Sequence, residues 1–84
     1  MGIVVRLDVM LALRKMKSKE LAEAIGLSEQ NLSALRSGKA RGVRFSTLSA
    51  ICDVLECQPG DLLEFVDERA EIRKFLPFNQ HILR

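Results

Sequence analysis

Residues 21–38 read LAEAIGLSEQNLSALRSG, and this stretch decides the fold. Apolar residues recur at three-and-four spacing on both sides of Gly26, which predicts two short amphipathic helices over about residues 18–25 and 28–36. Gly26 ends the first helix because glycine adopts a left-handed conformation at little cost, and Ser28 suits the N-cap of the second. The stretch therefore predicts a helical hairpin. The second helix of this hairpin either only packs against the first, or also presents its outer surface to a binding partner.

The spacing within residues 18–37 favours a helix-turn-helix over an ordinary hairpin. The fifth residue is the small Ala22, which lets two helices cross closely, and the ninth is Gly26, which permits the tight turn. Apolar side chains occupy the positions that lock the two helices together: Leu21, Ile25, Leu27, Leu32 and Leu35. Once the helices are locked at a steep angle, the outward residues of the second helix are not part of the core.

The outward face of the second helix is small and polar. Its candidate base-reading residues are Glu29, Gln30, Asn31, Ser33 and Ala34. Amide side chains make paired hydrogen bonds to adenine in a major groove, serine bonds to either a base or a phosphate, and alanine contacts a thymine methyl. We therefore expect residues 28–37 to form a recognition helix that enters the major groove of double-stranded DNA.

A basic segment directly follows this helix. The net charge of the whole chain is only +2, but residues 36–44 (RSGKARGVR) carry +4 and residues 64–71 carry −3. Ser37, Lys39 and Arg41 lie where they can meet the phosphate backbone beside the groove. The alternative is a solvated basic loop, and the neighbouring polar helix favours DNA.

Other segments predict further short elements. Residues 3–5 (IVV) are β-branched, which indicates a short N-terminal strand or an extended arm. Three more helices are expected over about residues 6–16, 46–55 and 59–65. Ser46 suits the N-cap of the middle one, and Phe45 before it can act as an apolar staple.

The length and composition fit one small domain. The chain has 84 residues, of which 48% are hydrophobic and 29% charged, and it contains no repeat or low-complexity linker. We expect an all-α domain of five helices over residues 1–67. Residues 68–84 form a C-terminal tail that is too apolar to stay free in solution, so a contact with the bundle, a second subunit or another protein is expected there.

The combined motif resembles a known family. Residues 21–40 (LAEAIGLSEQNLSALRSGKA), followed by residues 44–64 (RFSTLSAICDVLECQPGDLLE), are similar to the Cro and phage-repressor type of helix-turn-helix domain, the XRE family of small regulators. The resemblance extends over about residues 5–67. It implies a five-helix lambda-repressor-like fold, operator binding as a homodimer, and repression or activation of transcription.

The resemblance also assigns contacts to individual residues. The base-reading positions of the family fall on Glu29, Gln30 and Ala34. The phosphate positions after the recognition helix fall on Ser37 and Lys39. An arginine that some family members direct into a compressed minor groove corresponds to Arg44.

Two positions depart from the family pattern, one near the start of each helix of the helix-turn-helix. Ser18 stands where the family often has a glutamine that contacts phosphate, so this contact has a shorter reach, and Lys19 is a further candidate for a phosphate. Glu29 stands where glutamine is frequent. Its carboxylate accepts a hydrogen bond from cytosine but is repelled by phosphate, so it selects a different base or supports the helix N-terminus.

Other function classes find little support. The chain has one histidine, His81 in the tail, and no nucleophile-base arrangement, so we expect no enzyme, no cofactor and no metal site. Cys52 and Cys57 fit neither a CxxC redox pair nor zinc-ligand spacing, and we interpret them as small buried or half-buried residues. No apolar run is long enough to span a membrane, and the N-terminus does not resemble a secretory signal, so the protein is expected in the cytoplasm.

Two functions from different classes remain. The first is a homodimeric regulator that binds double-stranded DNA. The second is a protein-interaction module with the same fold, such as an antitoxin-like partner that binds through the tail. The polar helix and the basic segment favour the first, and the apolar tail favours the second.

Overall fold

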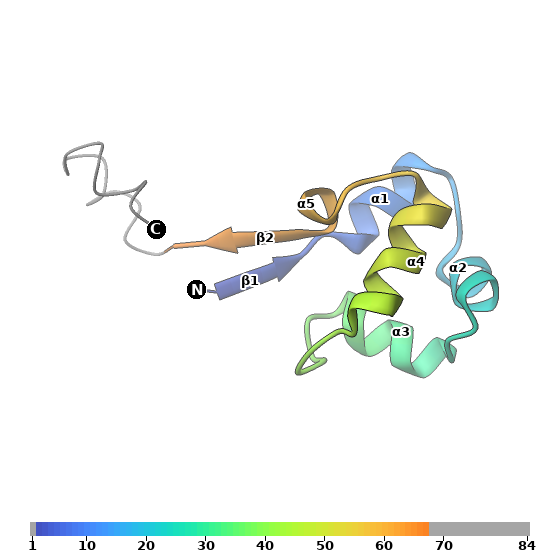
Figure 1. Cartoon of the computed structure of the whole chain (residues 1–84), viewed down its shortest axis with the longest axis horizontal. Coiled ribbons are helices and arrows are strands. Elements are labelled where there is room, and N and C mark those ends of the chain that lie inside the picture. Colours follow the sequence, from blue (N-terminus) through green and yellow to red (C-terminus); the bar gives the residue numbers. More distant parts are fainter. Residues whose placement is uncertain (1, 68–84) are drawn as a thin grey trace.

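The computed structural model of the chain describes residues 2–67. Its elements follow in the order β1 (Gly2–Val5), α1 (Leu7–Leu13), α2 (Ser18–Ile25), α3 (Glu29–Arg36), α4 (Phe45–Leu55), α5 (Pro59–Leu62) and β2 (Leu63–Val66). The helices form one body, and the two strands project from it as a ribbon (Figure 1). The expected tail over residues 68–84, with its predicted dimer or partner contact, lies outside the described residues.

The helix-turn-helix forms as its sequence predicts. Gly26 ends α2 with φ of 72°, in the left-handed region that glycine adopts most cheaply. The hydroxyl of Ser28 then accepts a hydrogen bond from the backbone N–H of Asn31 at 3.0 Å, which caps α3. The chain therefore turns sharply between two well-terminated helices.

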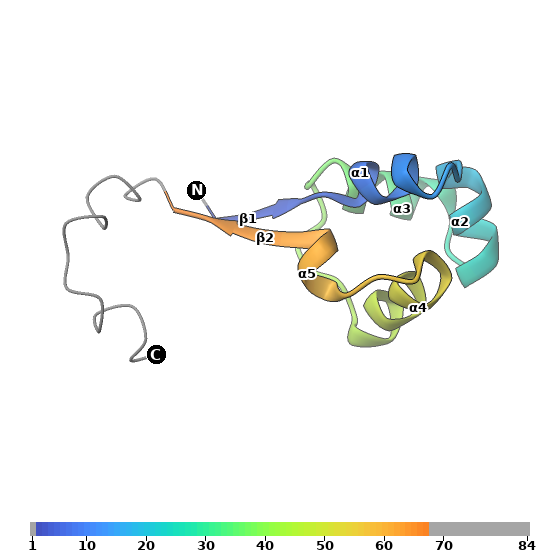
Figure 2. The same cartoon turned by 90° about the horizontal axis from the view of Figure 1, so that it is seen from above.

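One hydrophobic core joins the five helices. It consists of Leu7, Met10, Leu11, Leu21, Ala22, Leu32, Ile51, Leu55 and Leu62, all of which are buried. In Figure 1, α1 and α3 lie above and below α4, and Figures 1 and 2 both show α2 at the end of the body opposite the ribbon. Ala22 lies in this core as predicted, where a larger side chain would push α2 and α3 apart.

The fold is not all-α, which corrects one prediction. Strand β2 pairs antiparallel with β1 in the register Ile3–Phe65 and Val5–Leu63, so the expected N-terminal strand has a partner. The helix expected over residues 59–65 is therefore only the single turn of α5. Leu63, Phe65 and Val66 suit a strand, and pairing with β1 overrides the continuation of the helix.

Two contacts hold the base of the ribbon against α5. The backbone N–H of Arg6 donates to the carbonyl of Leu62 at 2.7 Å. The guanidinium of Arg6 also forms an ion pair with Glu64. The first residue after β1 is thereby joined to the end of α5 and to β2.

Two helix boundaries and one apolar contact also differ from expectation. Helix α1 ends at Leu13, before the predicted residue 16, because Lys15 has φ of 55°. Helix α4 begins at Phe45, so Ser46 is not its N-cap. The side chain of Phe45 is 87% exposed and therefore forms no apolar staple.

The two cysteines lie at the C-terminal end of α4 and are half-buried, within the range that was predicted. The backbone N–H of Cys57 donates to the carbonyl of Cys52 at 3.0 Å, which closes the end of the helix. Burial raises the pKa of the Cys57 thiol above its ordinary value, and the neighbouring Cys52 raises it further. Within residues 2–67, no helix has the length and apolar character that crossing a bilayer requires.

Candidate nucleic-acid interface

Helix α3 is anchored on one face and open on the other. Leu32 is buried in the core with 1% of its surface exposed, and Leu35 packs against the same core. The predicted base-reading residues Glu29, Gln30, Asn31 and Ser33 are exposed, whereas Ala34 is half-buried. The structure therefore brings all five of these residues onto a single helix that is held in place by its apolar side.

Arg36 fastens the end of α3 to two earlier helices. Its Nη1 donates to the hydroxyl of Ser18 at the start of α2, at 2.9 Å. Its Nε lies 2.8 Å from Oδ1 of Asp8 in α1. Arg36 of the basic segment therefore forms its polar contacts within the protein. Through its hydrogen bond with Arg36, Ser18 helps to hold α2 against α3.

The predicted phosphate-binding residues after α3 are held close to its end. The backbone N–H groups of Lys39 and Ala40 donate to the carbonyl of Ala34, at 2.9 and 3.0 Å. The hydroxyl of Ser37 donates to the same carbonyl at 3.2 Å. The turn folds back because Gly38 has φ of 79°. The side chains of Lys39 and Arg41 are exposed immediately beside α3.

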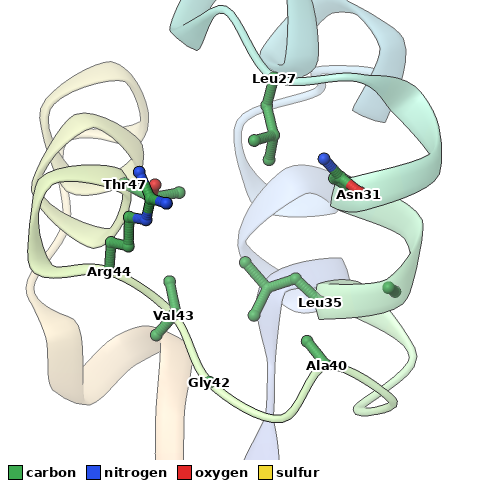
Figure 3. A pocket seen from close by; sticks show the side chains of 9 residues that line it. Leu27, Asn31, Leu35, Ala40, Gly42, Val43, Arg44 and Thr47 are labelled. Atoms are coloured by element: carbon green, nitrogen blue, oxygen red, sulfur yellow. The ribbon is translucent and has the colours of Figure 1, made fainter.

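An open groove of about 530 Å³ separates α3 from the start of α4. Asn31 lies on one wall, Arg44 and Thr47 lie on the other, and Leu35 and Val43 lie between them (Figure 3). Arg44 is exposed at the rim. The groove therefore has an apolar floor and polar side chains that approach it from both helices.

The N-terminus of α4 opens at this groove. Its first internal hydrogen bond runs from Leu48 N to Arg44 O at 2.9 Å, so the preceding amides have no partner within the helix. Helices α2, α3 and α5 each have a side-chain hydrogen bond at their start, whereas α1 and α4 have none. Free N–H groups and the helix dipole make this end of α4 suitable for an anion.

Four exposed cations in or beside the helix-turn-helix have no ion-pair partner among residues 2–67: Lys19, Lys39, Arg41 and Arg44. Their charge is available to an external anion, whereas that of Arg36 is not. In the same range, no three histidine, cysteine or acidic side chains lie close enough to hold a metal ion.

Thr47 and Arg36 are the residues that sequence reasoning missed. Thr47 lies in the first turn of α4 and was missed because its position on the wall of the groove opposite Asn31 depends on the packing of α4 against α3. Arg36 was counted only as part of the basic segment. No sequence signal pairs it with Asp8 or Ser18, since these residues lie on different helices.

Comparisons with known proteins agree with this geometry. Residues 6–68 match the family model of the Cro/C1-type helix-turn-helix DNA-binding domain. The chain is 57% identical over 65 residues to the uncharacterized helix-turn-helix transcriptional regulator YozG of Bacillus subtilis strain 168, a match that covers 77% of each chain.

Two solved structures share the fold. The transcriptional regulator VanUg superposes with a TM-score of 0.63 at 38% identity, over 81% of this chain and 92% of the other. A candidate DNA-binding protein from Bacteroides fragilis superposes with a TM-score of 0.66 at 27% identity, over 74% of this chain and 98% of the other. The family model covers most of the chain and coincides with its helix-turn-helix. The chain therefore belongs to the Cro/C1-type helix-turn-helix DNA-binding family.

Proposed function

We propose that this chain is a sequence-specific transcriptional regulator that binds double-stranded DNA as a homodimer in the cytoplasm. The observation that carries the proposal is the position of the exposed polar face of α3 beside the open N-terminus of α4. One surface thereby offers hydrogen-bonding side chains for base edges and free amides for phosphate.

In the proposed complex, α3 lies in the major groove. Gln30 and Asn31 hydrogen-bond to adenine, Glu29 accepts from the amino group of cytosine, and Ala34 contacts a thymine methyl. Ser33 bonds to a base or to the adjoining phosphate. The half-burial of Ala34 suits a short apolar contact, because only its methyl group is needed.

The sugar-phosphate backbone of one strand then lies over the groove between α3 and α4. The first-turn amides of α4 and the hydroxyl of Thr47 donate to its phosphates, and Arg44 reaches the phosphate or the minor groove beyond. Ser37, Lys39 and Arg41 approach the backbone from the end of α3, and Ser18 and Lys19 approach it from the start of α2. Ser18 retains a donor for this purpose, since Arg36 uses only its oxygen as an acceptor.

A homodimer would place two copies of α3 in successive major grooves. The half-sites of the target would then be related by two-fold symmetry and centred about 34 to 36 Å apart. Selection of bound sequences from a random duplex pool tests this directly. We expect a two-fold symmetric motif, and a pool with no enriched sequence would contradict sequence-specific binding.

A salt titration tests the phosphate contacts separately. Changing both Lys39→Ala and Arg44→Ala should flatten the dependence of log affinity on log salt by about 4 for the homodimer, because each of the two copies loses two phosphate contacts. Lys15→Asn is the matched control, because Lys15 is an exposed cation after α1 and asparagine tolerates its left-handed backbone. An unchanged slope in the double variant would remove these residues from the interface.

A further inference from the structure

The two free cysteines are brought together where α4 ends. Cys52 lies in the last turn of α4, and Glu56 then reverses the chain in the left-handed conformation, with φ of 51°. Beyond this reversal, the backbone N–H of Cys57 donates to the carbonyl of Cys52 at 3.0 Å. At a helix end of this kind, the side chains of the two residues joined by that hydrogen bond commonly contact each other. The fold therefore pairs two thiols that lie five residues apart in the sequence.

The paired thiols face an open groove. Both cysteines line it, and its volume is about 450 Å³. The rest of its lining belongs to α4 and to the turn before α5: Phe45, Leu48, Ser49, Gln58 and Pro59. Both cysteines are half-buried and also pack against the hydrophobic core. A small ligand can therefore reach the thiols from the groove, while the core holds them in place from behind.

A cation is fixed beside the pair. Nε of Arg14 donates to the carbonyl of Leu55 at 2.6 Å, and its Nη2 donates to the carbonyl of Glu56 at 3.0 Å. These carbonyls belong to the two residues that precede Cys57. Burial, Cys52 and Asp61 raise the pKa of the Cys57 thiol, whereas Arg14 lowers it. The guanidinium therefore lies where it can offset negative charge on the sulfur atoms.

Two thiols without a third ligand suit a narrow class of metal ions. Soft thiolate ligands favour Cu(I), zinc and iron–sulfur clusters. Structural zinc takes four ligands, and among residues 2–67 no three histidine, cysteine or acidic side chains form a metal-binding group. Cu(I) is a soft ion with a filled d shell, and two thiolates in a linear arrangement satisfy it. The pair therefore fits Cu(I) better than zinc.

We propose that Cys52 and Cys57 form a two-coordinate site for Cu(I), in which Arg14 balances the negative charge of the two thiolates. Each thiol releases its proton to water as its bond to copper forms, so one ion displaces two protons and stays Cu(I). The proposal departs from the expectation of no metal site, because the thiols meet only through the reversal at Glu56. The site lies at the end of α4 that points away from α3 (Figure 1), and it uses no residue assigned to DNA.

Competition for Cu(I) with the chelator bicinchoninate tests the site in the full chain. The titration is anaerobic and contains a reductant that is not a thiol. We expect one Cu(I) per chain with two sulfur ligands by X-ray absorption. Loss of an outer partner of a metal ligand costs about 10- to 100-fold in affinity, so Cys52→Ser and Cys57→Ser should each cost more than about 100-fold. Zn(II) in about ten-fold excess should leave the bound copper in place, because it finds only two of its four ligands.

The contribution of Arg14 has its own variant and control. Arg14→Gln should lower the affinity for Cu(I) by about 10-fold, because the thiolates lose the cation beside them. Lys15→Asn removes the same charge from the next residue, which makes no hydrogen bond to the end of α4, and it should bind Cu(I) as the wild type does. Equal affinities of Arg14→Gln and the wild type would contradict the role of Arg14.

The remaining outcomes are also decisive. Circular dichroism confirms the fold of each variant, and Cys52→Ala and Cys57→Ala repeat the test with side chains that suit a half-buried position. A wild type with two free thiols that binds no Cu(I) would overturn the proposal. Copper retained by a Cys52→Ser and Cys57→Ser double variant would also overturn it, by placing the ion on methionine or histidine. One ion per two chains would overturn a site within a single chain. No arm of the test involves DNA, so its failure leaves the proposed function untouched.

Discussion

The helix-turn-helix and the β-ribbon are both exposed, but they expose opposite kinds of side chain. Helix α3 buries Leu32 and presents Gln30 and Asn31 to solvent. The ribbon packs its half-buried inner pair, Val5 and Leu63, against the core and presents Ile3 and Phe65 to solvent. An exposed polar side chain forms hydrogen bonds only with a partner of matching donors and acceptors, so its contacts are specific. An exposed apolar side chain is stabilised by any apolar surface that removes it from water.

The two surfaces also differ in what supports them. Helix α3 is held by a core leucine, a serine cap and Arg36, so its outward side chains have a fixed position before any partner binds. The ribbon consists of two four-residue strands that reach beyond the core. The outward side chains of α3 are therefore held in place by the body, whereas those of the outer ribbon are not, and the following changes test this distinction.

The largest expected effect is the loss of the support under α3. Leu32→Ala should lower the free energy of unfolding by about 2 to 5 kcal/mol, because it removes a fully buried side chain and leaves a cavity. Ile3→Ala, measured at a concentration where the chain is monomeric, should change it by less than about 1 kcal/mol. Urea denaturation measures both, and similar losses would show that the ribbon supports the monomer as strongly as the core does.

The next effect concerns sequence preference in DNA binding. Gln30→Ala should cost about 1 to 3 kcal/mol at one base pair of the target and little at the others, because a paired hydrogen bond to one base is lost. Ile3→Ala on the ribbon should leave the preference for each base pair unchanged, because Ile3 lies outside the base-reading face of α3. Fluorescence anisotropy with a set of single-base variants of the selected site measures both. A uniform loss for Gln30→Ala would make it a positioning residue.

The sequence predicts the recognition half of the molecule well because its signals are local. Gly26, Ser28 and the apolar spacing lie within twenty residues, and each corresponds to a feature that the structure confirms. The five helices follow from the same kind of signal. The roles of individual side chains toward DNA remain predictions, since side-chain type at an exposed position is compatible with several partners.

The ribbon could not be predicted in the same way. Its first strand was expected from three β-branched residues, but its partner lies about sixty residues later in the chain. Phe65 and Val66 favour a strand locally, but no local signal identifies β1 as the partner that ends α5 at Leu62. The contact of Arg36 with Asp8 has the same character, because it joins residues whose proximity is created by the fold.

A substitution in the turn between α2 and α3 should lower the stability by a smaller amount, and Gly42 provides a matched control. Gly26→Ala should cost about 1 to 2 kcal/mol of stability, because alanine disfavours φ of 72°, and no neighbouring atom would clash with the added methyl group. Gly42→Ala also meets no neighbour and needs no positive φ, so it should be neutral or slightly stabilising. Thermal unfolding of both variants measures the difference, and equal stability would show that the turn tolerates a side chain.

The smallest effect compares one ion pair from each region. Arg36–Asp8 holds α3 and Arg6–Glu64 holds the ribbon, and all four side chains are at least 37% exposed, so each pair is worth about 1 kcal/mol or less. Arg36 also donates to the half-buried hydroxyl of Ser18. Arg36→Gln should therefore cost about 0.5 to 1.5 kcal/mol more than Arg6→Gln.

A double-mutant cycle assigns this excess to its source. If the Ser18 hydrogen bond is responsible, Ser18→Ala should remove most of the additional cost of Arg36→Gln, and Asp8→Asn should remove only the salt-dependent part. Urea denaturation at low and high salt provides the four free energies of each cycle. Equal costs for Arg36→Gln and Arg6→Gln would mean that α3 is held by its apolar face alone, and that its fixed position owes nothing to Arg36.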